Sequence, residues 1–163
     1  MDIRLARPDD LPALVAILNA AIARRQNGLL APVTVEGRAA WLDAHPPDAF
    51  PLRVASGAEG EVVGWCSLSP WRSGRGALAA TAEVSVYVAP GRQRQGVGTA
   101  LLRHAVRHAP EAGVDRLLAI GLETNAASLA LFRREGFDRW GTLPGVAVFG
   151  GERVGQWILG RAV

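Results

Sequence analysis

The sequence predicts an α/β protein in which a mixed sheet of about seven strands is flanked by about four helices. Its 163 residues, 49% hydrophobic and 20% charged, are enough for one globular domain with a full core. Segments with the two-residue period of strands alternate along the chain with segments of helical spacing. No linker, repeat or low-complexity tract divides them, so we expect a single domain over residues 1–163.

The N-terminal segment predicts a strand followed by two helices. Residues 3–7 alternate between apolar and polar side chains, which is the pattern of a half-buried strand. Apolar residues then recur at helical spacing over residues 10–25, which predicts the first helix. A second helix is expected to start after Thr34, to turn Trp41 inward and to end before Pro46, because proline cannot continue a helix.

The middle of the chain predicts three strands. The strands over residues 52–55 and 62–68 are expected to form a hairpin, and residues 70–80 then form a glycine-containing loop. Residues 83–88 alternate strictly, as Glu-Val-Ser-Val-Tyr-Val, and give the clearest strand of the sequence. This strand leads directly into the glycine-rich segment 90–98.

The last part of the chain predicts two helices and three strands. One helix begins near residue 97 and ends near Pro110, and the other is capped by Asn125 and stops at Gly136. The outer face of the first helix is expected to carry Arg103, His104, Arg107 and His108. The strands cover residues 117–122, 146–149 and 154–159.

The composition excludes several classes of protein. All 18 basic residues are arginine, but they are scattered and the formal net charge is only +3, so nucleic-acid binding ranks last. Arginine suits carboxylate and phosphate, which favours a small anionic ligand, although a biased genome explains the arginines equally well. No apolar run approaches the roughly 18–20 residues that cross a membrane, so we expect a cytoplasmic protein without a membrane partner.

Cysteine and histidine usage argues against a metal site or a disulfide framework. Cys66 is the only cysteine and lies among apolar residues, so we expect it in the core rather than as an acyl carrier. We interpret His45, His104 and His108 as surface residues. No glutamate or cysteine completes a metal site with the i,i+4 histidine pair, and we predict no metal.

The glycine-rich loop is the segment best suited to bind an anion. Residues 93–98, Gln-Arg-Gln-Gly-Val-Gly, lie where backbone N–H groups and a helix dipole converge, and the two glycines leave the backbone open to a pyrophosphate. Arg92 and Arg94 can add charge-assisted contacts. The loop lacks the Gly-Lys-Ser/Thr of nucleoside triphosphatases, and Leu101 occupies the third glycine position of the dinucleotide fingerprint. A plain tight turn is the alternative.

Two segments carry a resemblance to a known family. Residues 86–102, from Val-Tyr-Val-Ala-Pro to Gly-Thr-Ala-Leu-Leu, closely resemble the acetyl-coenzyme A (acetyl-CoA) loop of the GNAT N-acetyltransferases. Residues 125–137 are similar to the Asn-x-x-Ser…Leu-Tyr/Phe…Gly-Phe helix of that superfamily. The resemblance covers residues 3–159 and implies the GNAT fold, acetyl-CoA as co-substrate without a metal, and a homodimer.

Within the superfamily, the chain is most similar to the phosphinothricin acetyltransferase group. Thr81-Ala82-Glu83 leads into the loop strand, Pro70-Trp71 precedes an arginine-bearing loop, and Val154-Gly155-Gln156-Trp157 lies near the end. This resemblance implies direct acetyl transfer, through a tetrahedral intermediate, to the primary amine of a small amino-acid-like acceptor. Acetylation of a polyamine, an aminoglycoside or a protein N-terminus remains an alternative, as does a non-catalytic sensor of acetyl-CoA.

Glu83 is the residue that we expect to act as general base. Only a neutral amine attacks a thioester, so a carboxylate must remove the ammonium proton directly or through water, and the resemblance places the family's base here. A solvent-facing strand glutamate is the alternative. Strand parity puts Ser85 and Tyr87 on the face of Glu83, and Val84, Val86 and Val88 on the other face.

The resemblance implies that a strand, a loop and two helices contact acetyl-CoA. The backbone of Val86 and Val88 is expected to meet the pantetheine arm and to polarise the thioester carbonyl. Phe132 cannot donate a proton as the tyrosine or histidine of relatives would, so water protonates the thiolate or it leaves unassisted. The expected contacts are Val86, Tyr87, Val88, Gln93, Arg94, Gln95, Gly96, Val97, Gly98, Thr99, Asn125, Ser128 and Phe132.

The acceptor is expected beside the loop that follows the second hairpin strand. Trp71, Arg72 and Arg75 lie where the family gathers its acceptor, and an arginine there could pair with a carboxylate or phosphinate. Solvated loop arginines are the alternative. Three positions depart from the pattern of the phosphinothricin group, namely Leu78, Ala80 and Glu152.

Overall fold

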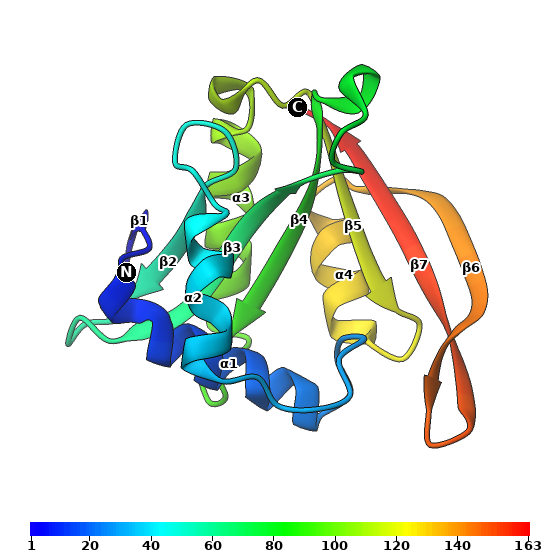
Figure 1. Cartoon of the computed structure of the whole chain (residues 1–163), viewed down its shortest axis with the longest axis horizontal. Coiled ribbons are helices and arrows are strands. Elements are labelled where there is room, and N and C mark those ends of the chain that lie inside the picture. Colours follow the sequence, from blue (N-terminus) through cyan, green and yellow to red (C-terminus); the bar gives the residue numbers. More distant parts are fainter.

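A seven-stranded mixed sheet organises the chain (Figure 1). The computed structural model describes residues 1–163. The strands are β1 (Asp2–Leu5), β2 (Leu52–Ser56), β3 (Val62–Pro70), β4 (Thr81–Val88), β5 (Arg116–Leu122), β6 (Asp138–Phe149) and β7 (Glu152–Ala162). The helices are α1 (Leu11–Ala23), α2 (Val35–Asp43), α3 (Val97–His108) and α4 (Ala126–Arg134). The predicted fold class is confirmed, and no helix combines the length and apolar character needed to cross a membrane.

The helices cover both faces of the sheet. α1 and α2 pack on one face, and α3 and α4 pack on the other (Figure 1). The two-residue period of the strands decides which face receives each side chain. Val54 and Trp65 belong to the core under α1, whereas their chain neighbours Ala55 and Cys66 belong to the core under α3. Two apolar cores therefore share one sheet.

The strands order the sheet as β1-β2-β3-β4-β5-β7-β6, and its centre is interrupted where β4 leaves β5. Residues 81–83 of β4 pair in parallel with residues 116–118 of β5, and the two strands then diverge (Figure 1). β4 stays paired with β3 up to Val88 without a register shift, while β5 stays paired with β7 up to Leu122. Each strand thus has one open edge facing the other.

The open edge of β4 presents backbone groups to this gap. The amide of Trp71 donates to the carbonyl of Thr81, and the amide of Ala89 donates to the carbonyl of Val63. In an antiparallel ladder such bonded positions recur every second residue, so the odd-numbered residues of β4 bond to β3. Beyond the residues paired with β5, the N–H and C=O groups that point into the gap therefore belong to Val86 and Val88.

Local signals at the helix ends behave as the sequence predicts. The Thr34 hydroxyl accepts a hydrogen bond of 3.1 Å from the amide of Gly37, and the Asn125 side chain accepts one of 3.1 Å from the amide of Ser128. Gly136 ends α4 with a φ of 79°, a left-handed conformation that favours glycine. Both predicted caps and the predicted helix stop are confirmed.

The predicted extent of the penultimate strand is wrong. The sequence pattern indicates a strand only over residues 146–149, whereas β6 begins at Asp138 and contains two register shifts against β7. β6 lies at the edge of the sheet and most of its side chains are exposed, so it shows no alternation of apolar and polar residues. β7 likewise extends beyond its predicted limits, residues 154–159, at both ends.

The expectation of three surface histidines is also wrong. His45 is only 9% exposed, because its ring packs edge-on against Trp41 at 4.7 Å and its Nδ1 lies 2.7 Å from the Trp41 carbonyl oxygen. His104 and His108 are half-buried rather than outside, and their rings lie 4.2 Å apart on α3. These contacts were not evident from helical spacing alone.

Candidate active site

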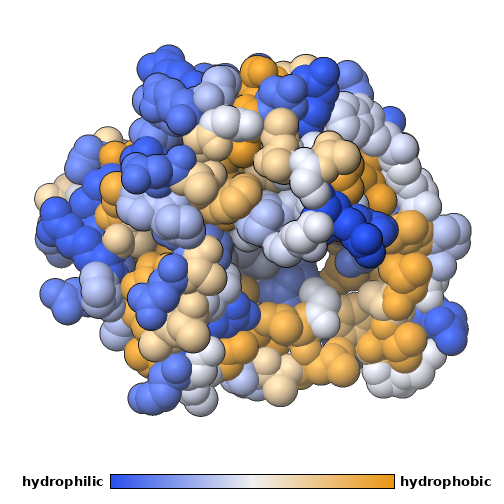
Figure 2. All heavy atoms as spheres, turned by 45° about the horizontal axis from the view of Figure 1, so that its top comes forward, coloured by the Kyte–Doolittle hydropathy of each residue, from blue (hydrophilic) through white to orange (hydrophobic).

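A cleft of about 1110 Å³ occupies the gap between β4 and β5 and is lined from both faces of the sheet. Its walls come from α1, residues 26–29, α2 and β3 on one face, and from the loop before α3, α3 itself and α4 on the other. Figure 2 shows a hollow in this side of the molecule with hydrophobic side chains along its lower rim. The volume of the cleft slightly exceeds the range of roughly 300–1,000 Å³ that is usual for ligand pockets. The cleft is therefore large enough to hold a long ligand.

Most of the predicted site residues meet in this cleft. Its lining includes Glu83, Val86, Tyr87, Val88, Gln93, Arg94, Gly96, Gly98, Thr99, Asn125, Ser128 and Phe132. The remaining predicted residues, Gln95, Val97, Trp71, Arg72 and Arg75, are not part of the lining. The sequence motifs therefore converge in space, with the acceptor loop as the exception.

The loop before α3 has the backbone shape of an anion site. Arg94 and Gly96 adopt positive φ angles of 59° and 85°, so amide groups of the loop turn toward one side at the N-terminus of α3. Gly98 lies against the side chains of Leu131 and Val88, and a Cβ atom there would come within 3.2 Å of Leu131. Arg92 instead pairs with Glu61 at 2.7 Å and does not line the cleft, contrary to expectation.

Glu83 lies at the point where β4 separates from β5. It faces Ser69 across the β3–β4 ladder and shares a sheet face with Tyr87, as parity predicts, while Val84 is buried on the opposite side. Its carboxylate is half-buried and has no ion-pair or hydrogen-bond partner, and burial raises its pKa. A carboxylate with these properties is suited to accept a proton from a ligand.

α4 forms the wall opposite β4. The Asn125 side chain caps α4 and also donates a hydrogen bond of 3.1 Å to the carbonyl of Gln26, which ties the segment after α1 to α4. Phe132 is 3% exposed and packs against Phe137 and Trp157, so only an edge of its ring meets the cleft. This wall is largely apolar.

An aromatic cluster and one arginine form the wall on the α2 side. Trp65 stacks on Tyr87 with ring centroids 4.4 Å apart and meets Trp41 edge-on at 5.5 Å. The Arg38 guanidinium lies over Trp41, 5.2 Å from the ring centroid, and lines the cleft. The sequence did not single out Arg38, because only the packing of α2 on the sheet brings it to the cleft.

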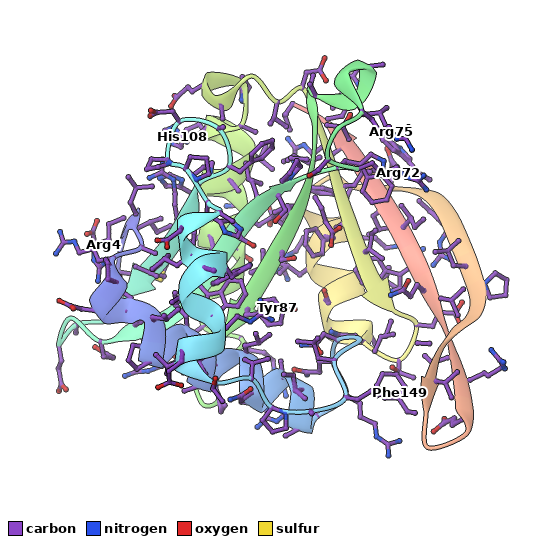
Figure 3. The ribbon with its side chains drawn as sticks, viewed as in Figure 1. Arg4, Arg72, Arg75, Tyr87, His108 and Phe149 are labelled. Atoms are coloured by element: carbon purple, nitrogen blue, oxygen red, sulfur yellow. The ribbon has the colours of Figure 1, made fainter.

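The predicted acceptor residues lie in the loop beside the start of β4, where the amide of Trp71 donates a hydrogen bond to the carbonyl of Thr81. Arg72 and Arg75 are exposed, and Figure 3 shows them to the side of the sheet near the end at which β4 begins, whereas Tyr87 lies near the other end. The Arg72 guanidinium stacks on Trp71 at 5.7 Å. The structure therefore does not bring these three side chains into the cleft, and their role in binding the acceptor stays a prediction.

Comparison with known proteins places this cleft in a family. The model of the Acetyltransferase (GNAT) family matches residues 19–137, the part of the chain that contains most of the cleft. The chain belongs to the GNAT family. The resemblance found in the sequence is confirmed, and the protein is an acetyl-CoA-dependent N-acetyltransferase.

Individual GNAT relatives match nearly the whole chain. YwnH of Bacillus subtilis, provisionally named a phosphinothricin acetyltransferase, is 42% identical over 99% of this chain and 98% of its own length. The L-methionine sulfoximine/L-methionine sulfone acetyltransferase of Pseudomonas paraeruginosa is 37% identical over 96% of this chain and 88% of its own. The structure of yncA from Salmonella typhimurium, solved with its cofactor acetyl-CoA, has a TM-score of 0.92 and 30% identity, covering 99% of this chain and 93% of that one.

The single cysteine of this GNAT protein is in the core, as predicted. Cys66 is buried under α3, and burial raises the pKa of its thiol to about 12. A thiol in this state is not ionised at neutral pH, so it is a poor nucleophile. Cys66 does not line the cleft, and no cluster of three metal-ligating side chains is present in the protein.

Proposed function

We propose that this GNAT enzyme acetylates the primary amine of a small amino-acid-like acceptor, of the phosphinothricin or methionine sulfoximine type, with Glu83 as general base. The observation that carries the proposal is the unpaired, half-buried carboxylate of Glu83 at the point where β4 and β5 separate. The names of YwnH and of the Pseudomonas paraeruginosa relative support the acceptor class.

The chain's own groups fit acetyl-CoA along the α3 side of the cleft. The amides at the N-terminus of α3, from Arg94 to Thr99, are suited to the pyrophosphate, and the open backbone groups of Val86 and Val88 are suited to the pantetheine arm. A backbone N–H at Val86 or Val88 can also polarise the thioester carbonyl. Gly98 has no side chain, which lets the start of α3 pack closely against Leu131 and Val88 beside these groups.

Glu83 removes the proton that keeps the acceptor amine unreactive. The ionised carboxylate takes this proton from the ammonium group, directly or through water. The neutral nitrogen then attacks the carbonyl carbon of the thioester and gives up its surplus proton to water. The C–S bond breaks, and the thiolate of coenzyme A departs. Transfer is direct in this scheme, which the buried Cys66 thiol supports because it cannot carry the acetyl group. Phe132 supplies no proton, so the thiolate leaves unassisted or takes its proton from water.

The positive φ of Gly96 gives a test of the proposed pyrophosphate site. Alanine at this position resists a left-handed backbone by about 1–2 kcal/mol, so Gly96→Ala should tilt the amides away and raise the Kd for acetyl-CoA about fivefold or more. Calorimetric titration with acetyl-CoA measures the change. Gly91→Ala is the control, because Gly91 has a similar φ of 79° but does not line the cleft. Equal Kd values for the two variants would argue against the site.

The proposed acceptor class is tested by measuring thiol release from acetyl-CoA. We expect release with phosphinothricin, methionine sulfoximine and methionine sulfone, and little with spermidine, an aminoglycoside or a short peptide. Release only with one of the latter three would keep the enzyme but replace its acceptor. Tight binding of acetyl-CoA without release from any acceptor would favour a sensor.

We further propose that the enzyme is one domain that acts as a cytoplasmic homodimer. Acetyl-CoA is an intracellular metabolite, which supports the location. The edge strand β6 exposes apolar side chains that a second copy could cover, including Leu143, Val146 and Val148. Light scattering of the purified protein measures the molar mass that decides this point.

A further inference from the structure

Arg38 differs from the other arginines that line the cleft. The four are Arg24, Arg38, Arg94 and Arg134. Arg24, Arg94 and Arg134 are exposed, and Arg134 donates a hydrogen bond of 2.9 Å to Thr99 beside the loop that precedes α3. Arg38 is half-buried on the α2 side, with no carboxylate oxygen within 4.0 Å of its guanidinium. It is a partly desolvated cation without a protein counter-ion.

The guanidinium of Arg38 is held in place by an aromatic stack. Its carbon lies 5.2 Å from the centroid of Trp41. Trp41 is fixed in turn by the edge of Trp65 and by the buried His45, whose ring nitrogen lies 2.7 Å from the Trp41 carbonyl oxygen. A guanidinium oriented in this way loses little conformational entropy when it binds a planar anion.

Arg38 and Glu83 act on the same part of the cleft. The Arg38 guanidinium lies over Trp41, which meets the edge of Trp65. Trp65 in turn stacks on Tyr87, which shares a sheet face with Glu83. Tyr87, Glu83 and Arg38 all line the cleft. A ligand on this side therefore meets a proton acceptor and a cation.

We propose that Arg38 binds the carboxylate of the acceptor while Glu83 receives the proton of its amine. This assignment rests on the proposed function, because an amino acid carries both groups on one carbon. A guanidinium binds a carboxylate through two parallel N–H···O bonds, and such a pair fixes the orientation of the amine. Arg38 would also repel polyamines, which carry positive charge where an amino acid carries a carboxylate. It is thus a specificity-determining residue for the acceptor.

The test compares two acceptors that differ only in the carboxylate. Methionine sulfone carries it, and 3-(methylsulfonyl)propan-1-amine is the same molecule without it. Charge-assisted hydrogen bonds contribute about 1.5–3 kcal/mol, so Arg38→Ala should raise the KM for methionine sulfone about 10- to 100-fold. The KM for the amine and the KM for acetyl-CoA should remain unchanged. Arg38→Lys should restore part of the loss, because it keeps the charge but not the fork.

A binding measurement separates failure of this inference from failure of the proposed function. Methionine sulfone is titrated calorimetrically into the wild-type enzyme and the Arg38→Ala variant with coenzyme A present, which needs no turnover. Arg107→Ala, at an exposed position of α3 outside the cleft, controls for the loss of one positive charge. Thermal unfolding of each variant confirms that it is folded.

Each outcome decides at least one of the two proposals. If Arg38→Ala leaves sulfone binding unchanged, or weakens both acceptors equally, Arg38 does not bind the carboxylate even if the wild-type enzyme acetylates amino acids. If the wild type binds the sulfone through Arg38 but does not acetylate it, the inference stands and the proposed acceptor is wrong. If the wild type binds only the amine without a carboxylate, both proposals fall.

Discussion

Glu83→Gln should lower kcat by a factor of about 10² to 10⁴, the range that a general base contributes, while the Kd for acetyl-CoA stays unchanged. Glutamine keeps the shape of the side chain but cannot take the ammonium proton. Steady-state kinetics with methionine sulfone and calorimetric titration with acetyl-CoA measure the two effects separately. Glu59→Gln, at an exposed position of the β2–β3 turn, is the matched control and should retain wild-type turnover. A Glu83→Gln enzyme with normal kcat would remove Glu83 from the mechanism.

The raised pKa of Glu83 sets the direction of the accompanying pH effects. Because burial raises this pKa, the folded state binds the proton more tightly than the unfolded state does. The stability contributed by this group therefore falls as pH rises from the ordinary glutamate pKa through the raised one. Glu83→Gln should thus be at least as stable as the wild type at pH 7. In the wild type, kcat/KM should fall at acidic pH with a midpoint above the ordinary glutamate pKa.

The second large effect is expected at Trp157, where Trp157→Ala should lower the free energy of unfolding by about 3–5 kcal/mol. Trp157 is 1% exposed, belongs to the core under α3, and lies with its ring against Gly121 of β5. Its removal leaves a cavity beside Phe132, whose ring is 6.1 Å away, centroid to centroid. Since each kcal/mol shifts Tm by roughly 2–4 °C in a protein of this size, calorimetry should record a loss of about 10 °C.

Trp140→Ala is the matched control for this prediction. Trp140 lies on the adjacent strand β6, but it is 52% exposed. Its substitution should cost less than half as much stability, because less apolar surface returns to water. Equal losses for the two tryptophans would show that burial in the core does not govern the contribution of Trp157. Calorimetry on both variants in the same buffer decides this.

The parts of the fold that sequence could predict are those with a strong local pattern. The alternation in residues 83–88 identified β4 and the face of each of its side chains, because a strand buried on both sides separates its two faces at every step. The caps at Thr34 and Asn125 were equally local, since each needs only a side-chain oxygen and an amide three residues away. The glycine loop was found because its residue types and its place between strand and helix are both in the chain.

The remaining features depend on contacts between distant segments. His45 is buried because α2 brings it against the sheet beside Ser69, and nothing in the residues around position 45 indicates that partner. Arg38 reaches the cleft for the same reason. The first part of β6 has no apolar period, because an edge strand with exposed side chains needs none. His45 and Ser69 are 24 residues apart in sequence, so no local pattern can indicate their contact.

The separation of β4 and β5 also determines how two substrates can reach one reaction centre. The short parallel pairing at residues 81–83 closes one end of the gap between the two strands. A second connection is the hydrogen bond from the Asn125 side chain, at the start of α4, to the carbonyl of Gln26, in the segment after α1. Between these two connections the sheet is open from one face to the other. In the proposed arrangement, the coenzyme on the α3 side and the acceptor on the α2 side would therefore enter this cleft from opposite faces of the sheet. Neither substrate has to leave before the other arrives, so the chemistry can take place in a complex that contains both.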